Sequence, residues 1–392
     1  MDFEHIKNLD DAYGAEVFSR FPVAFVGGRG ATLTDTEGKE YIDFGSGIAV
    51  NVFGACDEAW KNAVKEQLDK IQHVSNYYYC EPQAKLSELL CARTGARRVF
   101  FANSGAEANE CALKAARKYS FEKYGAGRAK IVSLNGSFHG RTLFTVTATG
   151  QEVFHKYFDP FVPEVVSADA NIEAIRRAAG DTACAVIIEC VQGESGVKTL
   201  DKNFIKSLET FCKERDVLLI CDEVQSGNGR TGTLYSYEQF GISPDIVTTA
   251  KGLGGGLPIG ACLFFRKTEH TLKAGDHGST FGGNPVCCAG AVNVIERLDE
   301  NFLLEVRAKG DYMRTKLRAI DGVKAVTGLG LMIGLEVNGN SKDIAKKCLE
   351  KGLLVLTAHE RVRIVPPLNI TKREMDEGLT IFREVLRHET ST

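Results

Sequence analysis

Two residues at the ends of apolar runs have the chemistry to hold one aromatic cofactor. Asp222 ends the segment DVLLICD, and Lys251 follows PDIVTTA and precedes GLGGGLPIG. Such runs predict strands buried on both faces of a parallel sheet, and ligands bind at the carboxyl ends of these strands. A carboxylate can pair with a pyridine nitrogen, and a desolvated amine can form a Schiff base with an aldehyde. The two residues therefore predict pyridoxal 5'-phosphate (PLP) as the cofactor.

Each residue alone has a simpler interpretation. Lys251 can be an exposed lysine at a strand end, and Asp222 can cap the next turn or pair with a surface cation. Their spacing favours the cofactor, because the interval between them holds a loop, the helical YSYEQFG segment and one further strand. That order brings the ends of two neighbouring strands together.

A phosphate site is predicted where RVFFANSGAEANECALKAARKY supplies a strand, a tight turn and a helix start. Ser104 and Glu107 fit a capping box, while Gly105 and Ala106 leave first-turn N–H groups uncovered by large side chains. Plain helix capping explains the same residues equally well. The glycine run GLGGG matches no nucleotide-binding motif, so we interpret it as a flexible turn.

Two further groups of residues have the chemistry to contact a cofactor or substrate. In KIVSLNGSFHGRT, the Phe138 ring can stack on a pyridine, and the Arg141 guanidinium can hold a carboxylate through two hydrogen bonds. The alternatives are a core phenylalanine and a surface ion pair. Glu194 and Arg363 are opposite charges far apart in the chain, for which solvated loop positions are the default interpretation.

The elements that position these residues follow from the hydrophobic pattern. Between about residues 58 and 285, helical patterns alternate with short apolar runs, which predicts a doubly wound α/β domain with a mainly parallel sheet. The runs ATLTDT and YIDF predict an antiparallel meander before it. A long helical stretch to about residue 320, several short strands and a helix from about Thr371 predict an α+β lobe. We expect a large domain at 46–285 and a small domain at 286–392. We expect the N-terminal segment 1–45 to be part of the small domain.

Composition narrows the function classes. The chain has 392 residues, 44% of them hydrophobic, and 48 Lys and Arg balance 51 Asp and Glu. No global positive field favours nucleic acid or anionic lipid. No run approaches the about 20 apolar residues of a membrane span, and the start has no leader pattern. We expect a cytoplasmic protein with no nucleic-acid or membrane partner. The 12 cysteines lack zinc spacing or CxxC pairs, so we expect neither a metal site nor a disulfide framework.

Several motifs together resemble a known family. The segments NSGAEANE, SFHGRT, QGESGV, DEVQSGNGRTG, TTAKGLGGGLPIGA and STFGGNP have the order and spacing of the class III aminotransferases of PLP fold type I. The resemblance covers about residues 20–370. Within the class, FGSGIAVNVFG and HVSNYYYCEPQ most resemble the acetylornithine aminotransferases. One segment departs: where the family usually has a His-Pro helix start, this chain reads FGACDEAWKNAV, so Asp57 becomes the predicted helix N-cap.

The resemblance implies a role for each position. Lys251 would hold PLP and move a proton, while Asp222 would keep the pyridine nitrogen protonated. The cofactor contacts that it further implies are Gly105, Ala106, Phe138, Glu223, Val224, Gln225 and Thr280. Thr280 and Ser279 would act from the second subunit, which implies a homodimer with shared active sites.

The resemblance also implies the reaction. The terminal amino group of N2-acetyl-L-ornithine would pass to 2-oxoglutarate, giving N-acetyl-L-glutamate 5-semialdehyde and L-glutamate in arginine biosynthesis. Arg141 would bind the substrate α-carboxylate, with Phe138 and Ser279 nearby. Glu194 would mask Arg363 and release it for the α-carboxylate of 2-oxoglutarate or glutamate. Ornithine, succinyl-diaminopimelate and 4-aminobutyrate stay open as donors, and so does a binding protein that keeps the fold without turnover.

Overall fold

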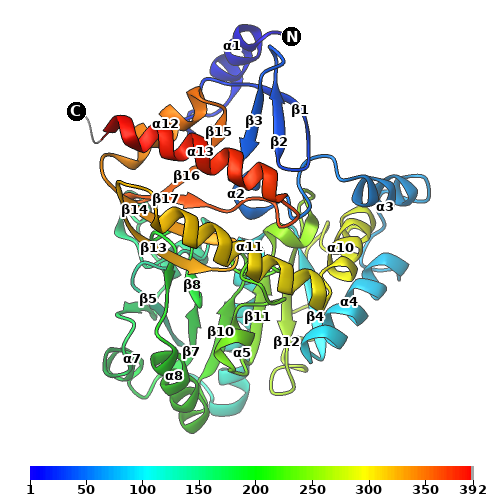
Figure 1. The fold of residues 1–392 in the computed structure, drawn as a ribbon. Helices are drawn as coiled ribbons and strands as arrows, with labels where there is room; N and C mark the ends of the chain where they lie inside the picture. Colours follow the sequence, from blue (N-terminus) through cyan, green and yellow to red (C-terminus); the bar gives the residue numbers. More distant parts are fainter. Residues whose placement is uncertain (390–392) are drawn as a thin grey trace.

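The computed structural model describes residues 1–389, and a seven-stranded sheet forms the centre of its large lobe, in the lower half of Figure 1. From edge to edge its strands are β4 (Arg98–Ala102), β12 (Gly260–Phe264), β11 (Ile246–Thr249), β10 (Leu218–Asp222), β7 (Ala183–Ile188), β5 (Lys130–Leu134) and β6 (Val165–Ala168). Neighbouring strands are parallel, except that β12 runs antiparallel to β11 and β4. The predicted mainly parallel sheet is confirmed.

Helices cover both faces of this sheet, as the apolar runs require. They are α4 (Glu81–Thr94), α5 (Gly105–Tyr124), α6 (Leu143–Ala148), α7 (Ile172–Ala179), α8 (Lys202–Arg215), α9 (Tyr237–Phe240) and α10 (Pro285–Arg297). Along β10, Ile220 joins the core formed with α5, while its neighbours Leu219 and Cys221 join the core that includes Leu208 of α8. The strand is buried on both sides, so its sequence does not alternate.

Two smaller sheets form the second lobe. The first has the order β1 (Phe25–Arg29), β2 (Thr32–Asp35), β3 (Glu40–Asp43) and β15 (Leu353–Leu354). The second has the order β13 (Val323–Leu329), β14 (Met332–Val337), β17 (Arg361–Ile364) and β16 (Leu356–Ala358). The predicted N-terminal meander is confirmed by the antiparallel pairing of β1, β2 and β3. Figure 1 shows these blue strands beside the orange and red elements of the C-terminal part.

The remaining elements include helices that begin at an aspartate, which caps the first turn. They are α1 (Phe3–Tyr13), α2 (Ser46–Ala49), α3 (Glu58–Leu68), α11 (Glu300–Arg318), α12 (Ser341–Glu350), α13 (Lys372–Glu389), the 3-10 turns η1 (Glu152–Phe154) and η2 (Lys251–Gly254), and the hairpin β8 (Val191–Gln192) and β9 (Lys198–Thr199). The predicted cap of α3 is confirmed, because Asp57 accepts the N–H of Trp60 at 2.9 Å. The long helical stretch is two helices, since Asp299 caps a new helix through the N–H of Phe302.

The lobe boundary follows from packing. Helix α10 packs against α3 and α4 beside the large sheet. We therefore propose that the large lobe extends to Arg297, beyond the expected boundary at 285, and that segment 1–45 belongs with the small lobe. The last three residues of the expected small domain, 390–392, lie outside the described residues.

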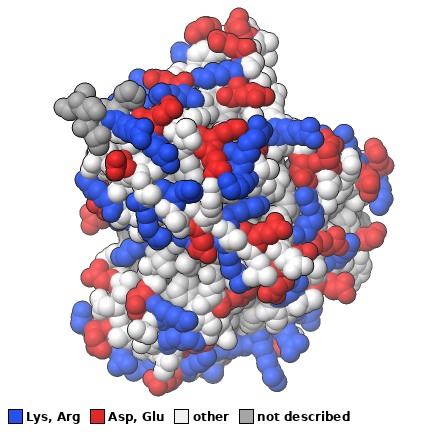
Figure 2. Space-filling view, in the orientation of Figure 1, with Lys and Arg blue, Asp and Glu red and all other residues white. Residues whose placement is uncertain are grey.

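The surface carries no obvious single-sign field on the face that Figure 2 presents, where lysine and arginine side chains are interspersed with aspartate and glutamate. Within residues 1–389, no helix combines the length and apolar composition that crossing a membrane requires.

Candidate active site

The carboxyl ends of β10 and β11 open into a cavity of about 470 Å³. The two strands are parallel neighbours with Asp222 opposite Thr248, so Asp222 and Lys251 reach the same sheet edge. Eight predicted site residues line the cavity, namely Gly105, Ala106, Phe138, Arg141, Asp222, Val224, Gln225 and Lys251. A larger hollow of about 1010 Å³, lined by residues between 324 and 361, contains none of them. The chemistry is therefore concentrated in the smaller cavity.

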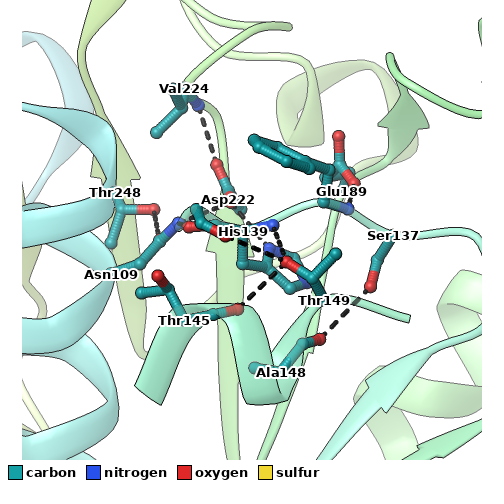
Figure 3. Close-up of polar contacts among 12 residues, drawn as sticks. Asn109, Ser137, His139, Thr145, Ala148, Thr149, Glu189, Asp222, Val224 and Thr248 are labelled. Carbon is teal, nitrogen blue, oxygen red and sulfur yellow. Dashed lines mark hydrogen bonds and ion pairs between the residues drawn. The ribbon is translucent and has the colours of Figure 1, made fainter. Parts of the chain in front are cut away.

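Asp222 is fixed by a buried hydrogen-bond network (Figure 3). Its Oδ2 accepts from Asn109 Nδ2 and His139 Nδ1, both at 2.7 Å, and its Oδ1 accepts from the N–H of Val224 at 3.0 Å. Thr248 Oγ1 donates to Asn109 Oδ1 at 2.6 Å and so fixes the amide. Because a carboxylate only accepts, His139 carries its hydrogen on Nδ1. Oδ1 has one donor and can accept a second from a ligand.

Sequence reasoning missed Asn109, although a signal was present. It lies four residues after Gly105 on α5, so the two share one helix face. It is also fully buried. The Asn109 amide lies one turn inside a helix whose start lines the cavity. Because it is buried, its hydrogen-bonding groups must be satisfied by neighbours, and one of these is Asp222.

Lys251 starts the η2 turn, one residue after the end of β11, with a positive φ of 43°. Burial lowers the pKa of its amine below the ordinary lysine value. The charge of Glu194 opposes this shift, and that of Arg363 adds to it. A lowered pKa makes the neutral, nucleophilic amine accessible.

The start of α5 faces the same cavity. Ser104 caps it by accepting the N–H of Glu107 at 3.2 Å, and Glu107 Oε2 accepts the N–H of Asn103 at 2.7 Å. Glu107 Oε2 also accepts from Ser104 Oγ at 3.3 Å, but the backbone N–H that it accepts is that of Asn103, whereas a standard capping box uses the N–H of the cap residue itself. Gly105 and Ala106 line the cavity at the first turn, where N–H groups lack intrahelical partners. This helix start can bind an anion.

Phe138 and Arg141 form an aromatic and cationic wall. The Phe138 ring packs edge-on against Phe154 at 5.4 Å between centroids. The exposed Arg141 guanidinium lies 4.0 Å from the Phe154 ring centroid and 5.7 Å from that of Phe138. Within residues 1–389, no carboxylate pairs with Arg141, so its guanidinium is available to a ligand.

Glu194 and Arg363 form an ion pair next to the cavity. Arg363 Nη1 lies 2.6 Å from Glu194 Oε1 and 2.9 Å from Gln225 Oε1, and Gln225 Nε2 donates to Glu194 at 2.9 Å. The Arg363 side chain is 4% exposed and that of Glu194 25%. Burial opposes ionisation of Glu194, but Arg363 outweighs it, so the pKa of Glu194 lies below its usual value. The default interpretation of Glu194 and Arg363 as solvated loop charges is therefore wrong, because the two side chains form a largely buried ion pair.

Glu223 does not line the cavity. Its fully buried carboxylate accepts hydrogen bonds from Ser226 Oγ at 2.6 Å, from the N–H and Oγ of Ser236 at 2.9 and 2.7 Å, and from the N–H of Tyr237 at 2.8 Å. Burial raises the pKa of Glu223 to about 7 despite these bonds. Its side chain is occupied in fixing the α9 region and offers nothing to a cofactor.

Ser279 and Thr280 also lie outside the cavity lining of their own chain. Thr280 is exposed, and Ser279 is half-buried with its Oγ accepting from Asn103 Nδ2 at 3.1 Å. Within a single chain, Ser279 therefore touches the cavity lining through Asn103, and Thr280 is not part of it.

Comparisons with known proteins agree with the chemistry of the site, because the matching proteins are aminotransferases. The family model for aminotransferase class III matches residues 13–386. The chain is 48% identical over 391 residues to the acetylornithine aminotransferase of Haemophilus ducreyi, covering 98% of this chain and 99% of the relative.

Two solved structures are similar over nearly the whole chain. An ornithine aminotransferase from Toxoplasma gondii, with partial occupancy of PLP at its active site, has a TM-score of 0.94 and 30% identity, covering 99% and 95% of the two chains. The acetylornithine aminotransferase of Elizabethkingia anophelis has a TM-score of 0.87 and 29% identity, covering 99% and 100%. With its large mainly parallel sheet and smaller α+β lobe, the molecule has PLP fold type I. The chain belongs to the class III aminotransferase family.

Proposed function

We propose that the chain is a PLP-dependent aminotransferase that moves the terminal amino group of N2-acetyl-L-ornithine to 2-oxoglutarate. The products are N-acetyl-L-glutamate 5-semialdehyde and L-glutamate, in arginine biosynthesis, and we place the enzyme in the cytoplasm. The convergence of Asp222, Lys251 and the start of α5 on one cavity carries the chemistry. The 48% identity to an acetylornithine aminotransferase supports the substrate.

The residues present fit PLP. The spare acceptor capacity of Asp222 Oδ1 suits a protonated pyridine nitrogen, and the start of α5 suits the phosphate. Phe138 and Val224 both line the cavity and would pack against opposite faces of the ring. When bound, PLP supplies an electron sink for the electrons of the broken C–H bond.

Lys251 has two tasks in this proposal. Its amine would hold the cofactor. Once substrate has displaced it, the same amine would take the proton from the carbon that bears the transferred amine and deliver it to C4' of the cofactor. The lowered pKa of the buried amine supports both tasks, because only the neutral form can attack a carbonyl or accept a proton. Gln225 would hydrogen-bond the phenolic oxygen of the cofactor.

Two substrates of different charge use the same site. Acetylornithine has a single carboxylate, remote from the amine that it transfers, and Arg141 would hold it through parallel hydrogen bonds. For glutamate or 2-oxoglutarate, Glu194 would move away and Arg363 would bind the α-carboxylate, which lies beside the reacting carbon. Arg363 Nε is buried without a partner among the described residues, which leaves it free to take part in that binding.

A homodimer completes the proposed site. The partner subunit's Thr280 would reach the phosphate, and the partner subunit's Ser279 would lie near the substrate. The exposed position of Thr280 in a single chain supports this assignment.

Ornithine is the second candidate donor, because the chain superposes on an ornithine aminotransferase with a TM-score of 0.94. The lower identity, 30% against 48%, makes it the weaker candidate. Succinyl-diaminopimelate and 4-aminobutyrate complete the set of donors to compare.

The deciding experiment measures glutamate formed from 2-oxoglutarate with each of the four donors at equal concentration. Acetylornithine should give the highest kcat/KM. A higher value for another donor would change the substrate, and cofactor binding without turnover of any donor would favour a non-catalytic protein.

A further inference from the structure

Glu189 is a buried carboxylate that the proposed reaction does not use. It follows β7 directly, lines the cavity and is 5% exposed. Its Oε1 accepts the N–H of Phe138 at 2.9 Å, and its Oε2 accepts the N–H of Gly193 at 3.2 Å. One side chain therefore holds two backbone segments that are distant in sequence.

The Phe138 side of this bridge belongs to the cofactor wall. Phe138 N–H is bound to Glu189, and its ring lines the cavity beside His139, which holds Asp222. A shift of this backbone would therefore move the aromatic wall and loosen the network around Asp222.

The Gly193 side belongs to the substrate-side ion pair. Gly193 directly precedes Glu194, and its carbonyl accepts from Arg363 Nη1 at 3.3 Å. A Cβ at this position would lie 2.3 Å from Gln225 Oε1, so the backbone is packed directly against that amide. A shift of Gly193 would reach Glu194, Gln225 and Arg363 together.

We infer that Glu189 is a positioning residue that couples the Phe138 segment to the Gly193–Glu194 segment. The tasks assigned to the two segments rest on the proposed function, whereas the coupling rests on the two hydrogen bonds. A carboxyl group suits this role, since each of its two oxygens accepts one N–H. While Glu194 swings away from Arg363, Gly193 stays fixed through Glu189 and acts as the pivot.

Amide hydrogen exchange tests the coupling without any ligand. Glu189→Gln keeps the shape but replaces one acceptor oxygen by an NH2 group, which leaves one buried N–H unpaired. Peptides covering 136–141 and 192–196 should then exchange faster together, by about tenfold. Glu189→Asp keeps the carboxylate but is too short to span both segments, so it should accelerate exchange in the same two peptides. It replaces the glutamine variant in the test if that variant fails to fold. Faster exchange in only one segment, or in neither, would overturn the coupling.

Glu209→Gln is a matched control. Glu209 is 8% exposed and its carboxylate accepts the N–H of Ser243 at 2.8 Å, but it lies on α8 and does not line the cavity. Exchange at 136–141 and 192–196 should stay unchanged in this variant. Accelerated exchange there would mean that any loss of a buried carboxylate loosens the lobe, and would overturn a specific role for Glu189.

The second readout uses the holoenzyme and separates positioning from mere stabilisation. Glu189→Gln should weaken PLP binding about tenfold and also change the ratio of the half-reaction efficiencies for acetylornithine and glutamate. An unchanged ratio with weakened PLP binding would overturn the link to the ion pair. If the wild type fails to transaminate acetylornithine, the proposed function fails, and the exchange experiment still decides the role of Glu189.

Discussion

Arg363 on β17 and Glu194 after β8 are 169 residues apart, yet Arg363 Nη1 lies 2.6 Å from Glu194 Oε1. The first residue belongs to a small-lobe sheet and the second to the loop that borders the cavity. Gln225 bonds to both residues and also lines the cavity, so the ion pair is connected to the cofactor site. The charge on Arg363 is neutralised locally while this contact persists.

Removing the Glu194 carboxylate should expose that positive charge. In Glu194→Ala, the half-reaction efficiency with glutamate should rise about tenfold relative to that with acetylornithine, since an uncompensated buried charge gains most from a new partner. Stopped-flow measurement of both half-reactions gives the ratio. Glu336→Ala is the control, because Glu336 meets Arg361 at 3.5 Å on the same sheet but at the surface. An unchanged ratio in Glu194→Ala would rule out the masking role.

Replacing Lys251 should abolish covalent attachment of the cofactor. Lys251→Ala should lower kcat by about 10³ or more, because the same amine is nucleophile and base. Borohydride reduction of the holoenzyme followed by peptide mapping should place the label on Lys251 alone. The exposed Lys114 provides a control substitution that should leave labelling intact. Label on a different lysine would contradict the site.

Neutralising Asp222 should remove the partner of the pyridine nitrogen. Asp222→Asn should lower kcat about 100-fold or more while leaving the neighbouring Asn109 in place. Because the His139 ring bonds to Asp222 and Asp222 is the group that would contact the pyridine nitrogen, His139→Asn should have a smaller effect, within about tenfold. Single-turnover rates at saturating substrate check both values. A larger loss in His139→Asn than in Asp222→Asn would refute this order.

Asp57 should contribute to stability in two separable ways. It caps α3 and pairs with Arg297 at 2.6 Å, so Asp57→Ala should lower the free energy of unfolding by about 1–2 kcal/mol. Asp57→Asn keeps the capping oxygen but loses the charge and one of the two oxygens that accept from Arg297, which should cost less than removing the whole side-chain cap. Urea denaturation of the three proteins measures the difference.

The pH dependence of that difference has a definite sign. Burial opposes ionisation of Asp57, but the Arg297 hydrogen bond and charge outweigh it, so the folded-state pKa is lowered. The stabilisation is therefore complete above the unfolded pKa of about 4 and is lost as the pH falls through the folded pKa. The gap between the wild type and Asp57→Asn should narrow in acid, and a gap that widens would contradict the assignment.

The sequence pattern predicts the central sheet because of a physical rule. Strands buried on both faces must be apolar throughout, and parallel strands deliver their ends to one edge, which is why the placement of Asp222 and Lys251 on one cavity could be anticipated. The end of α10 could not be anticipated from the sequence. Asp299 lies within a continuous helical pattern, and only its capping hydrogen bond reveals the break between the two helices.

Other features depend on distances that no local pattern encodes. Glu189 and Glu223 both follow apolar strands as acidic residues, yet one lines the cavity and the other binds Ser226, Ser236 and the Tyr237 amide instead. The sequence resemblance, rather than spacing, suggested that Glu194 and Arg363 act together. Their ion pair is a tertiary contact between the two lobes.

The parallel pairing of β3 with β15 has a consequence for synthesis. Strand β3 leaves the ribosome some 300 residues before its partner, because Ile42 pairs with Leu353. The nascent chain must keep the edge of β3 unpaired until translation has nearly ended, which exposes it to premature association. Slow codons or chaperone contacts would therefore have their greatest effect on yield when they act before the C-terminal part emerges.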